Sequence, residues 1–205
     1  MSQDTVIHWF RQDLRLADNP ALLSASKRGR VVPVFILDED NPGKFAAGGA
    51  SRWWLSHSLA SLARSLGGHL SIYKGNPSDV LSDIAHRFQV SAIYWNRCYE
   101  PWRMHRDAAL KIHFKTQGID VQSHNGSLLW EPWSIRKDDG TPHRVFSSFY
   151  RKGCLKSDQP RAPLSQPEQA TYIGDSGSPH ACKPQELLPQ NRWYEKLEPY
   201  WHIGE

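Results

Sequence analysis

The sequence predicts an α/β fold, a five-stranded doubly wound parallel sheet followed by an extended linker. Two observations lead to this prediction. Short apolar runs alternate five times with segments of helical periodicity, and the links between them are short. The run at residues 31–37 is also apolar at every position, which is typical of strands covered on both faces.

The first apolar run, residues 6–10, ends at a loop of alternating charge that leads into a helix over residues 21–26. Asn19 and Pro20 supply an N-cap and a first helical position for that helix. The charged side chains of the loop are Arg11, Asp13, Arg15 and Asp18.

Four more strands and three more helices follow in alternation. The strands are predicted at residues 31–38, 70–75, 91–96 and 120–124, and the helices at 51–66, 77–88 and 102–117. We expect Ser51 to cap the second helix and Gly67 to follow its end. The apolar stripe of that helix is Trp54, Leu55, Ser58, Leu59, Leu62 and Leu66.

Polar clusters follow the first, second and fourth strands. Because the carboxyl ends of parallel strands meet at one edge of the sheet, these three clusters are predicted to converge there. In open α/β sheets, ligands bind outside that edge. The sequence therefore predicts a binding site built from three stretches that are far apart along the chain.

The pattern changes after Ser127. Residues 134–136 and 143–145 are predicted to pair as a hairpin around Asp138-Asp139-Gly140. A short helix is expected at residues 146–155, and then a surface linker that is rich in Pro, Ser, Gln and Gly. The expected organisation is an α/β domain at 1–130, a hairpin and short helix completing it at 131–155, and a linker at 156–205.

Composition narrows the class of protein. A net charge of +4 and a pI near 9.0 are compatible with a polyanionic partner. No apolar run has the length of a membrane span, and the N-terminus has no signal-peptide pattern. The three cysteines form no CxxC pair, which favours a reducing cytoplasm and argues against a metal site.

The charged and aromatic side chains at the predicted edge admit two interpretations. Arg11, Arg52, Arg97 and Glu100 suit either a ligand or ion pairs that fasten neighbouring elements. Aromatic residues there suit either the core or the wall of a pocket. They are Trp95, Tyr99 and Trp102.

Several blocks carry a resemblance to a known family. They are residues 10–19 (FRQDLRLADN), 50–55 (ASRWWL), 94–97 (YWNR), 99–101 (YEP), 125–129 (NGSLL), 144–150 (RVFSSFY) and 201–205 (WHIGE). In this order they resemble the N-terminal region of the DNA photolyase and cryptochrome family. The resemblance covers essentially the whole chain.

The resemblance implies a Rossmann-like N-terminal domain that carries a light-harvesting antenna chromophore, either a reduced folate, a deazaflavin or a flavin. Members have a second, helical domain that binds FAD and damaged DNA. For this protein it implies a deoxyribodipyrimidine photo-lyase, a carbon–carbon lyase that splits cyclobutane pyrimidine dimers. The catalytic residues would then lie in a C-terminal FAD domain outside these residues. A cytoplasmic monomer without membrane contact is expected.

The resemblance also suggests which residues hold the antenna. Arg52 is expected to face an anionic group, and Asp38 and Glu100 to accept protons from the ring or its side chain. The full set is Arg11, Phe35, Ile36, Leu37, Asp38, Arg52, Asn96, Arg97, Tyr99 and Glu100.

Two departures from the family pattern stand out. Ser147-Ser148 replaces a Thr-Pro pair. Trp102 and Arg103 replace charged residues that some folate-binding members use. The second departure argues against a folate held between the two domains.

Two alternative functions are compatible with the same residues. The first is a cryptochrome-type blue-light photoreceptor, which differs from a photolyase in the helical domain and its tail. The second is a stand-alone nucleotide-binding α/β domain. The apolar residues at 193–201 argue against the second alternative, because such a patch needs a partner surface.

Overall fold

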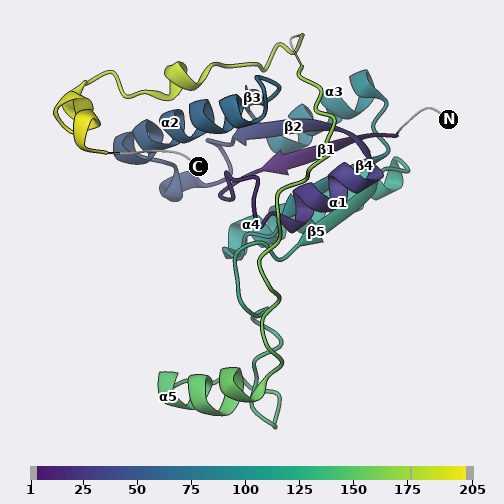
Figure 1. Cartoon of the computed structure of the whole chain (residues 1–205), viewed down its shortest axis with the longest axis vertical. Helices are drawn as coiled ribbons and strands as arrows, with labels where there is room; N and C mark the ends of the chain where they lie inside the picture. The colour runs from purple at the N-terminus through teal and green to yellow at the C-terminus, as the bar shows by residue number, and fades with distance from the viewer. Residues whose placement is uncertain (1–3, 176, 202–205) are drawn as a thin grey trace.

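The computed structural model describes residues 4–175 and 177–201. Its centre is a parallel sheet in the order β3-β2-β1-β4-β5, so the predicted fold class is confirmed (Figure 1). The strands are β1 (Asp4–Phe10), β2 (Gly29–Leu37), β3 (Ser71–Lys74), β4 (Ala92–Asn96) and β5 (Asp120–His124). The register pairs Phe10 with Phe35 and Trp9 with Trp95, so these strands end at a common edge.

Four long helices cover the sheet in two layers. They are α1 (Pro20–Arg28), α2 (Gly49–Ser65), α3 (Pro77–Phe88) and α4 (Pro101–Thr116). Residues of α1 and α2 pack with Val6 and Phe10 on one face, and residues of α3 and α4 pack with Ile7 and Trp9 on the other. Adjacent residues of β1 therefore face opposite layers, as the alternation of a strand requires.

Polar caps start two of the helices, and the cap of α1 is the predicted one. The Asn19 side chain accepts from the backbone N–H of Leu22 at α1, and the Asn76 side chain accepts from the N–H of Ser78 at α3. A proline occupies the first turn of both helices, where a missing N–H costs nothing.

The start and the buried face of α2 differ from prediction. Gly48 is the N-cap, and Ser51 lies inside the first turn. Trp53 is buried, whereas Trp54 is 40% exposed. Leu59, Leu62 and Leu66 are buried as predicted, and the buried face extends to Ser56 because α2 also packs against residues 184–187, where the Ser56 hydroxyl donates to Pro184 at 2.8 Å.

Residues 128–156, which we call the arm, project away from the sheet and end in a short helical segment (Figure 1). That segment comprises α5 (Phe146–Ser148), a π-helical turn over Phe149–Gly153 and a 3₁₀ turn over Cys154–Lys156. The predicted short helix is thus present. The predicted hairpin is wrong: Lys137 and Thr141 form a hydrogen-bonded turn, but no strand pair forms around it. The turn chemistry was right, but neither flank meets a sheet edge that would extend it.

Residues 161–182, which we call the strap, return from the arm across the sheet. The strap forms bridges from Tyr172 to Val31 and from Ala181 to Tyr73. Asp175 accepts hydrogen bonds from Arg87 at 2.6 and 2.7 Å. The predicted surface linker is therefore present, and it is tied to the sheet.

Short 3₁₀ turns complete the chain. They span Gly43–Phe45, Pro184–Leu187, Trp193–Lys196 and Glu198–Tyr200. The last block of the resemblance, residues 201–205, lies outside the described residues apart from Trp201.

Candidate functional site

A cavity of about 960 Å³ lies at the carboxyl edge of the sheet, between α2 and α4. Its floor includes residues 35–38 at the end of β2 and Trp9 and Arg11 at the end of β1. Trp54 of α2 and Trp102 of α4 form parts of its walls. A volume of this size, with aromatic walls and a few charged groups, is typical of a site for a small organic ligand.

Four charged side chains form a continuous buried chain at the cavity. Arg11 donates to Asp107 and to the backbone carbonyl of Asn96. Arg106 donates to Asp107 at 2.9 Å and to Asp38 at 3.0 Å. Two guanidiniums thus pair with two carboxylates, which satisfies the charges and fixes α4 against the ends of β1 and β2.

Indole rings separate the guanidinium groups. The Arg106 guanidinium lies 4.8 Å from the ring centre of Trp9 and 5.2 Å from that of Trp102. The Arg11 guanidinium lies 5.1 Å from Trp9 and 5.8 Å from Trp95. These cation–π contacts hold the rings and the guanidinium planes in fixed positions.

Three residues that line the cavity have a buried hydrogen-bond donor without a partner among the described residues. The donors are the indole N–H of Trp9 and the Nε–H groups of Arg11 and Arg103. A buried donor without an acceptor is costly. These donor atoms are closed to solvent and to the cavity, so a ligand in the cavity accepts from them only when the side chains turn toward it.

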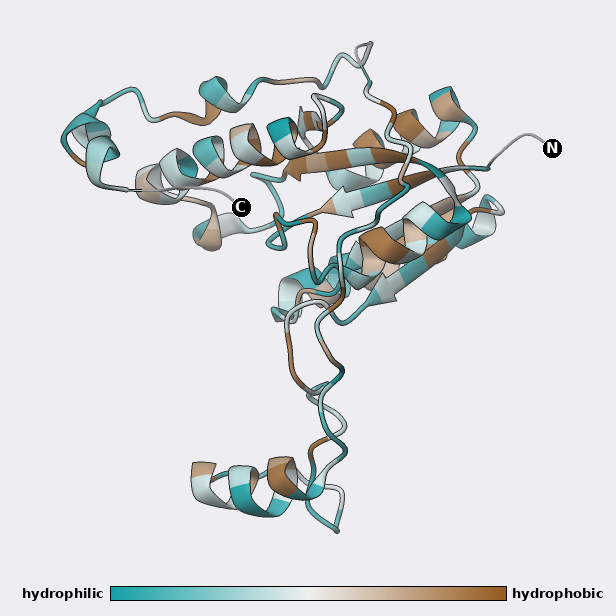
Figure 2. Cartoon of the chain, in the orientation of Figure 1, coloured by the Kyte–Doolittle hydropathy of each residue, from teal (hydrophilic) through white to brown (hydrophobic). Residues whose placement is uncertain are grey.

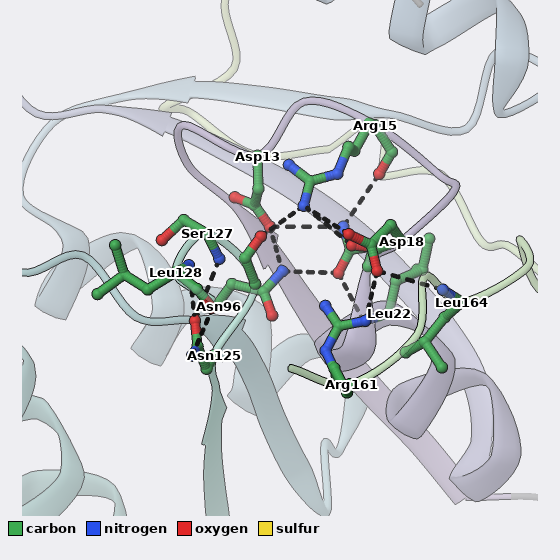
Figure 3. A network of polar contacts seen from close by, with 12 residues as sticks. Asp13, Arg15, Asp18, Leu22, Asn96, Asn125, Ser127, Leu128, Arg161 and Leu164 are labelled. Carbon is green, nitrogen blue, oxygen red and sulfur yellow. Dashed lines mark hydrogen bonds and ion pairs between the residues drawn. The ribbon is translucent and has the colours of Figure 1, made fainter. Parts of the chain in front are cut away.

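The rest of the first loop is held by a second network, which joins the first where the backbone N–H of Arg11 donates to Asp13 at 3.0 Å (Figure 3). The buried Asn96 amide donates to Asp13 at 2.5 Å and to Asn19 at 2.7 Å. Its oxygen accepts from the backbone N–H of Ala21 at 3.2 Å. Asn96 therefore joins the end of β4 to the start of α1, and its amide is occupied by the protein itself.

Asp18 ties the strap to this loop. It accepts from Arg161 and from the backbone N–H of Leu164, and its own N–H donates to Leu164 at 2.8 Å. Burial would raise the pKa of the Asp18 carboxyl, but these hydrogen bonds outweigh burial and lower it. Arg15 donates to the Gly126 carbonyl at 2.5 Å. Asp13, Arg15 and Asp18 thus fasten the fold.

The structure brings half of the predicted site residues to the cavity wall. These are Arg11, Phe35, Ile36, Leu37 and Asp38. Asp38 differs from expectation in its partners, because its carboxylate accepts from Arg106 and from Asn41.

The other half does not line the cavity. Arg52 binds Glu39, which also pairs with Lys74 at 2.6 Å; the Lys74 hydrogen bond is the main cause that lowers the pKa of Glu39. Glu100 accepts from Gln12 at 3.2 Å. Asn96, as described above, is buried in the second network.

Arg97 and Tyr99 face away from the cavity, toward the arm. Both donate to the carboxylate of Glu131. Burial and this hydrogen bond raise the pKa of Tyr99 to about 12. The pair thus anchors the start of the arm to the end of β4.

The sequence predictions missed Trp9, Arg106 and Asp107. The signal for them was present in α4, where Trp102, Arg103, Arg106 and Asp107 fall within two turns immediately after a strand. That face of α4 points toward the carboxyl edge, so its charged residues join the site.

Other site types find no support in the described residues. Across residues 4–175 and 177–201, no three His, Cys, Asp or Glu side chains are grouped so as to hold a metal ion. Within the same ranges no helix is both long and apolar enough to cross a bilayer.

The fold and site define a class: a doubly wound α/β domain with a ligand-sized cavity at the carboxyl edge and a long arm beyond it. A family model described as DNA photolyase matches residues 6–168. The chain belongs to the DNA photolyase family, and within it corresponds to the N-terminal α/β region shared by photolyases and cryptochromes.

Similar proteins carry both names. A deoxyribodipyrimidine photo-lyase of Agrobacterium fabrum is 38% identical over 98% of this chain and 42% of its own length. Cryptochrome-2 of Arabidopsis thaliana is 37% identical over 93% of this chain and 32% of its own length. The chain thus spans less than half of either relative.

Solved structures agree with the fold. A class III photolyase from Agrobacterium tumefaciens superposes with a TM-score of 0.87 at 35% identity, over 100% of this chain and 42% of that one. An archaeal photolyase from Sulfolobus tokodaii, described with two FAD molecules and a novel light-harvesting cofactor, gives 0.67 at 27% identity over 89% and 40%.

Proposed function

We propose that this chain is the antenna-binding domain of a light-driven deoxyribodipyrimidine photo-lyase, and that the antenna chromophore binds in the cavity between α2 and α4. The observation that carries the proposal is the cavity itself, with its volume and its aromatic walls. The light-harvesting cofactor named for the archaeal relative supports it.

The residues present fit a planar heterocycle. Trp54, Trp102 and Phe35 line the cavity, and their aromatic side chains are suited to pack against a ring. The paired charges of Asp38 and Arg106 are satisfied by each other, so they shape the site without repelling a neutral ring. When bound, the chromophore would absorb light and pass the energy on. A reduced folate, a deazaflavin and a flavin all have such a ring.

The remaining parts of the proposed protein lie beyond this chain. We assign FAD, damaged-DNA binding and the splitting of the dimer to a C-terminal helical domain, and no catalytic residue to the residues described. We divide the chain into the antenna domain at 1–130, its completion at 131–155 and the interdomain linker at 156–205. We further propose a cytoplasmic monomer.

The arm supports the existence of that second domain. Phe146 is 75% exposed, and Val145, Tyr150 and Leu155 are also exposed. An apolar surface of this kind needs a partner, and we propose that the helical domain covers it.

A cryptochrome-type photoreceptor is the second candidate function. The near-equal identities of the two relatives, 38% and 37%, favour neither name. The two functions differ in dimer splitting, which a photolyase performs and a photoreceptor does not.

One experiment tests antenna and repair together. The whole protein is purified from its host, its absorption spectrum and bound chromophores are identified by mass, and dimer splitting under blue light is measured. We expect FAD, a second chromophore and repair. Absence of a second chromophore would refute the antenna, and absence of repair with both chromophores bound would favour the photoreceptor.

Two matched variants link the chromophore to the cavity. Ser58→Trp adds bulk to the cavity wall, and Ser65→Trp places the same bulk on the exposed end of α2. We expect S58W to lose the second chromophore while retaining FAD, and S65W to retain both. A second chromophore that persists in S58W would contradict the proposed location.

A further inference from the structure

The cavity contains more arginine charge than its carboxylates neutralise. Four arginines line it, together with the single carboxylate of Asp38. As described above, Arg11 and Arg106 pair with Asp38 and Asp107, which gives a set of zero net charge. The affinity of the cavity for a negatively charged ligand therefore depends on the two remaining arginines, Arg15 and Arg103.

Arg15 is the better satisfied of these two. It donates to the carbonyls of Asp18 and Gly126 at 2.9 and 2.5 Å, and the Asp18 carboxylate lies 3.7 Å away. Its guanidinium is thus committed to holding the loop.

Arg103 is poorly satisfied. Among the described residues the one carboxylate within 4.0 Å of it is Glu100, at 3.7 Å, and the Glu100 side chain is 41% exposed. Its Nη1 donates to the sulfur of Cys98 at 3.3 Å, a weak acceptor, and its buried Nε, the atom 3.7 Å from Glu100, has no hydrogen-bond partner among the described residues.

The Arg103 guanidinium is nevertheless held in place. It lies 4.9 Å from the ring centre of Trp102, and its side chain is 22% exposed. Arg103 also sits in the first turn of α4, which contains no acidic residue. A cation at that end of a helix opposes the helix dipole. The negative group near this end of α4 is Glu100, the N-cap residue, whose side chain is 41% exposed and therefore offsets the repulsion only weakly.

We propose that Arg103 binds the anionic tail of the cavity's ligand, a carboxylate or a phosphate, while the ring of that ligand lies in the cavity. This inference rests on the proposed antenna function and narrows it to planar rings with a negatively charged tail. A planar guanidinium fork binds either anion through paired hydrogen bonds. Because Trp102 already orders the fork, little side-chain entropy is lost on binding.

The test uses two pairs of probes that differ in tail charge. The first pair is FMN and riboflavin, and the second is 5,10-methenyltetrahydrofolate and its glutamyl diamide, in which both carboxylates are neutral. The pairs separate a phosphate source from a carboxylate source. Affinities are measured by fluorescence titration of the FAD-loaded whole protein, so that the FAD site does not compete.

We expect at least one charged probe to bind about tenfold or more tightly than its neutral counterpart, which corresponds to one charge-assisted hydrogen bond. Arg103→Gln should remove this preference while leaving the neutral probe's affinity unchanged. Arg103→Lys should retain part of it, because the charge remains but the fork is lost. The preference should also weaken with added salt in the wild type and not in R103Q.

Arg30→Gln is the matched control. Arg30 lies at the start of β2, at the opposite edge of the sheet, and donates to Thr5. R30Q should retain the preference for the charged probe. Melting temperatures of all variants verify that each is folded.

The outcomes separate this inference from the proposed function. If charged and neutral probes bind equally in both pairs, or if R103Q keeps the preference, the role of Arg103 is refuted and the antenna site stands. If no flavin or folate probe binds the wild-type cavity, the role of Arg103 is refuted, and the antenna proposal is decided by the search for a second chromophore in the purified whole protein.

Discussion

Apolar residues are buried in the sheet and its helices but exposed in the arm. In the sheet region, Ile7, Val32 and Ile93 are fully buried between two layers of helices. In the arm, Phe146 and Leu155 are 75% and 63% exposed on a segment that lies far from the sheet (Figure 2). The sheet region can therefore fold on its own contacts, whereas the arm gains little from this chain and has the properties of a docking element.

Polar residues show the same contrast. Around β1 and β4, buried polar groups join into networks, as Asp13, Asn19 and Asn96 do. In the arm, Asp139 and Arg136 bond to residues of their own turn and remain exposed. Stability should therefore be sensitive to polar substitutions in the first region and insensitive to them in the second.

The largest effect is expected at Asn96. Asn96→Leu removes two donors from the first loop and leaves the buried Asp13 carboxylate with fewer partners. We expect the free energy of unfolding to fall by about 3 kcal/mol, because a buried charge that loses a partner is strongly destabilising. Urea denaturation of the whole protein measures it.

Asn125→Leu is the control for this prediction. Asn125 is half-buried in the neighbouring loop, and its side chain bonds to Leu128 and Ser127 (Figure 3). Its loss should cost less than about 1 kcal/mol. Equal losses of unfolding free energy in the two variants would show that the buried network contributes no more to stability than the contacts of Asn125 do.

The next effect is the acid sensitivity contributed by His8. This side chain is fully buried, and neither ring nitrogen has a partner among the described residues. Burial lowers the pKa of His8 from 6.5 to about 4. Between pH 6.5 and 4 the unfolded chain binds a proton at this position and the folded chain does not. Stability is therefore full above pH 6.5 and falls as the pH drops, by up to about 3 kcal/mol.

His8→Leu should flatten this part of the stability profile without lowering stability at pH 7.5. Guanidinium denaturation at pH 7.5, 5.5 and 4.5 provides the measurement. His86→Leu, on the exposed side of α3, should leave the slope unchanged. An unchanged slope in H8L would mean that acid acts on other groups.

The order of strands and helices could be predicted from the sequence because each element depends on residues that are close together in the chain. Apolar runs such as residues 31–37, and caps such as Asn19 and Asn76, act within a few residues of the chain. The hairpin failed for the opposite reason. A turn at residues 137–141 is also local, but strands need a partner edge that only tertiary structure provides.

For the candidate site, the sequence predicts the location but not the ion pairs. The edge of the sheet was predictable, since topology alone brings Arg11 and Asp38 there. The pairing of the charged side chains was not predictable, because it depends on the rotation of α4 about its axis. With the rotation that the structure has, Arg106 forms an ion pair with Asp38, and Arg52 forms one with Glu39. Residue type and spacing are the same for either pairing.

The smallest effect on stability is expected in the arm. Phe146→Ser removes an apolar side chain that is already 75% exposed and stacks on Tyr150, at 5.9 Å between ring centres. Unfolding of the sheet region should change by less than about 0.5 kcal/mol, because little buried area is lost. FAD retention by the whole protein should nevertheless fall, since the proposed contact with the helical domain is weakened. Lys152→Ser, an exposed substitution in the same segment, is the control. If F146S destabilised the sheet region as much as Asn96→Leu, the arm would have to be counted as part of the folding core, and the division between the two regions would fail.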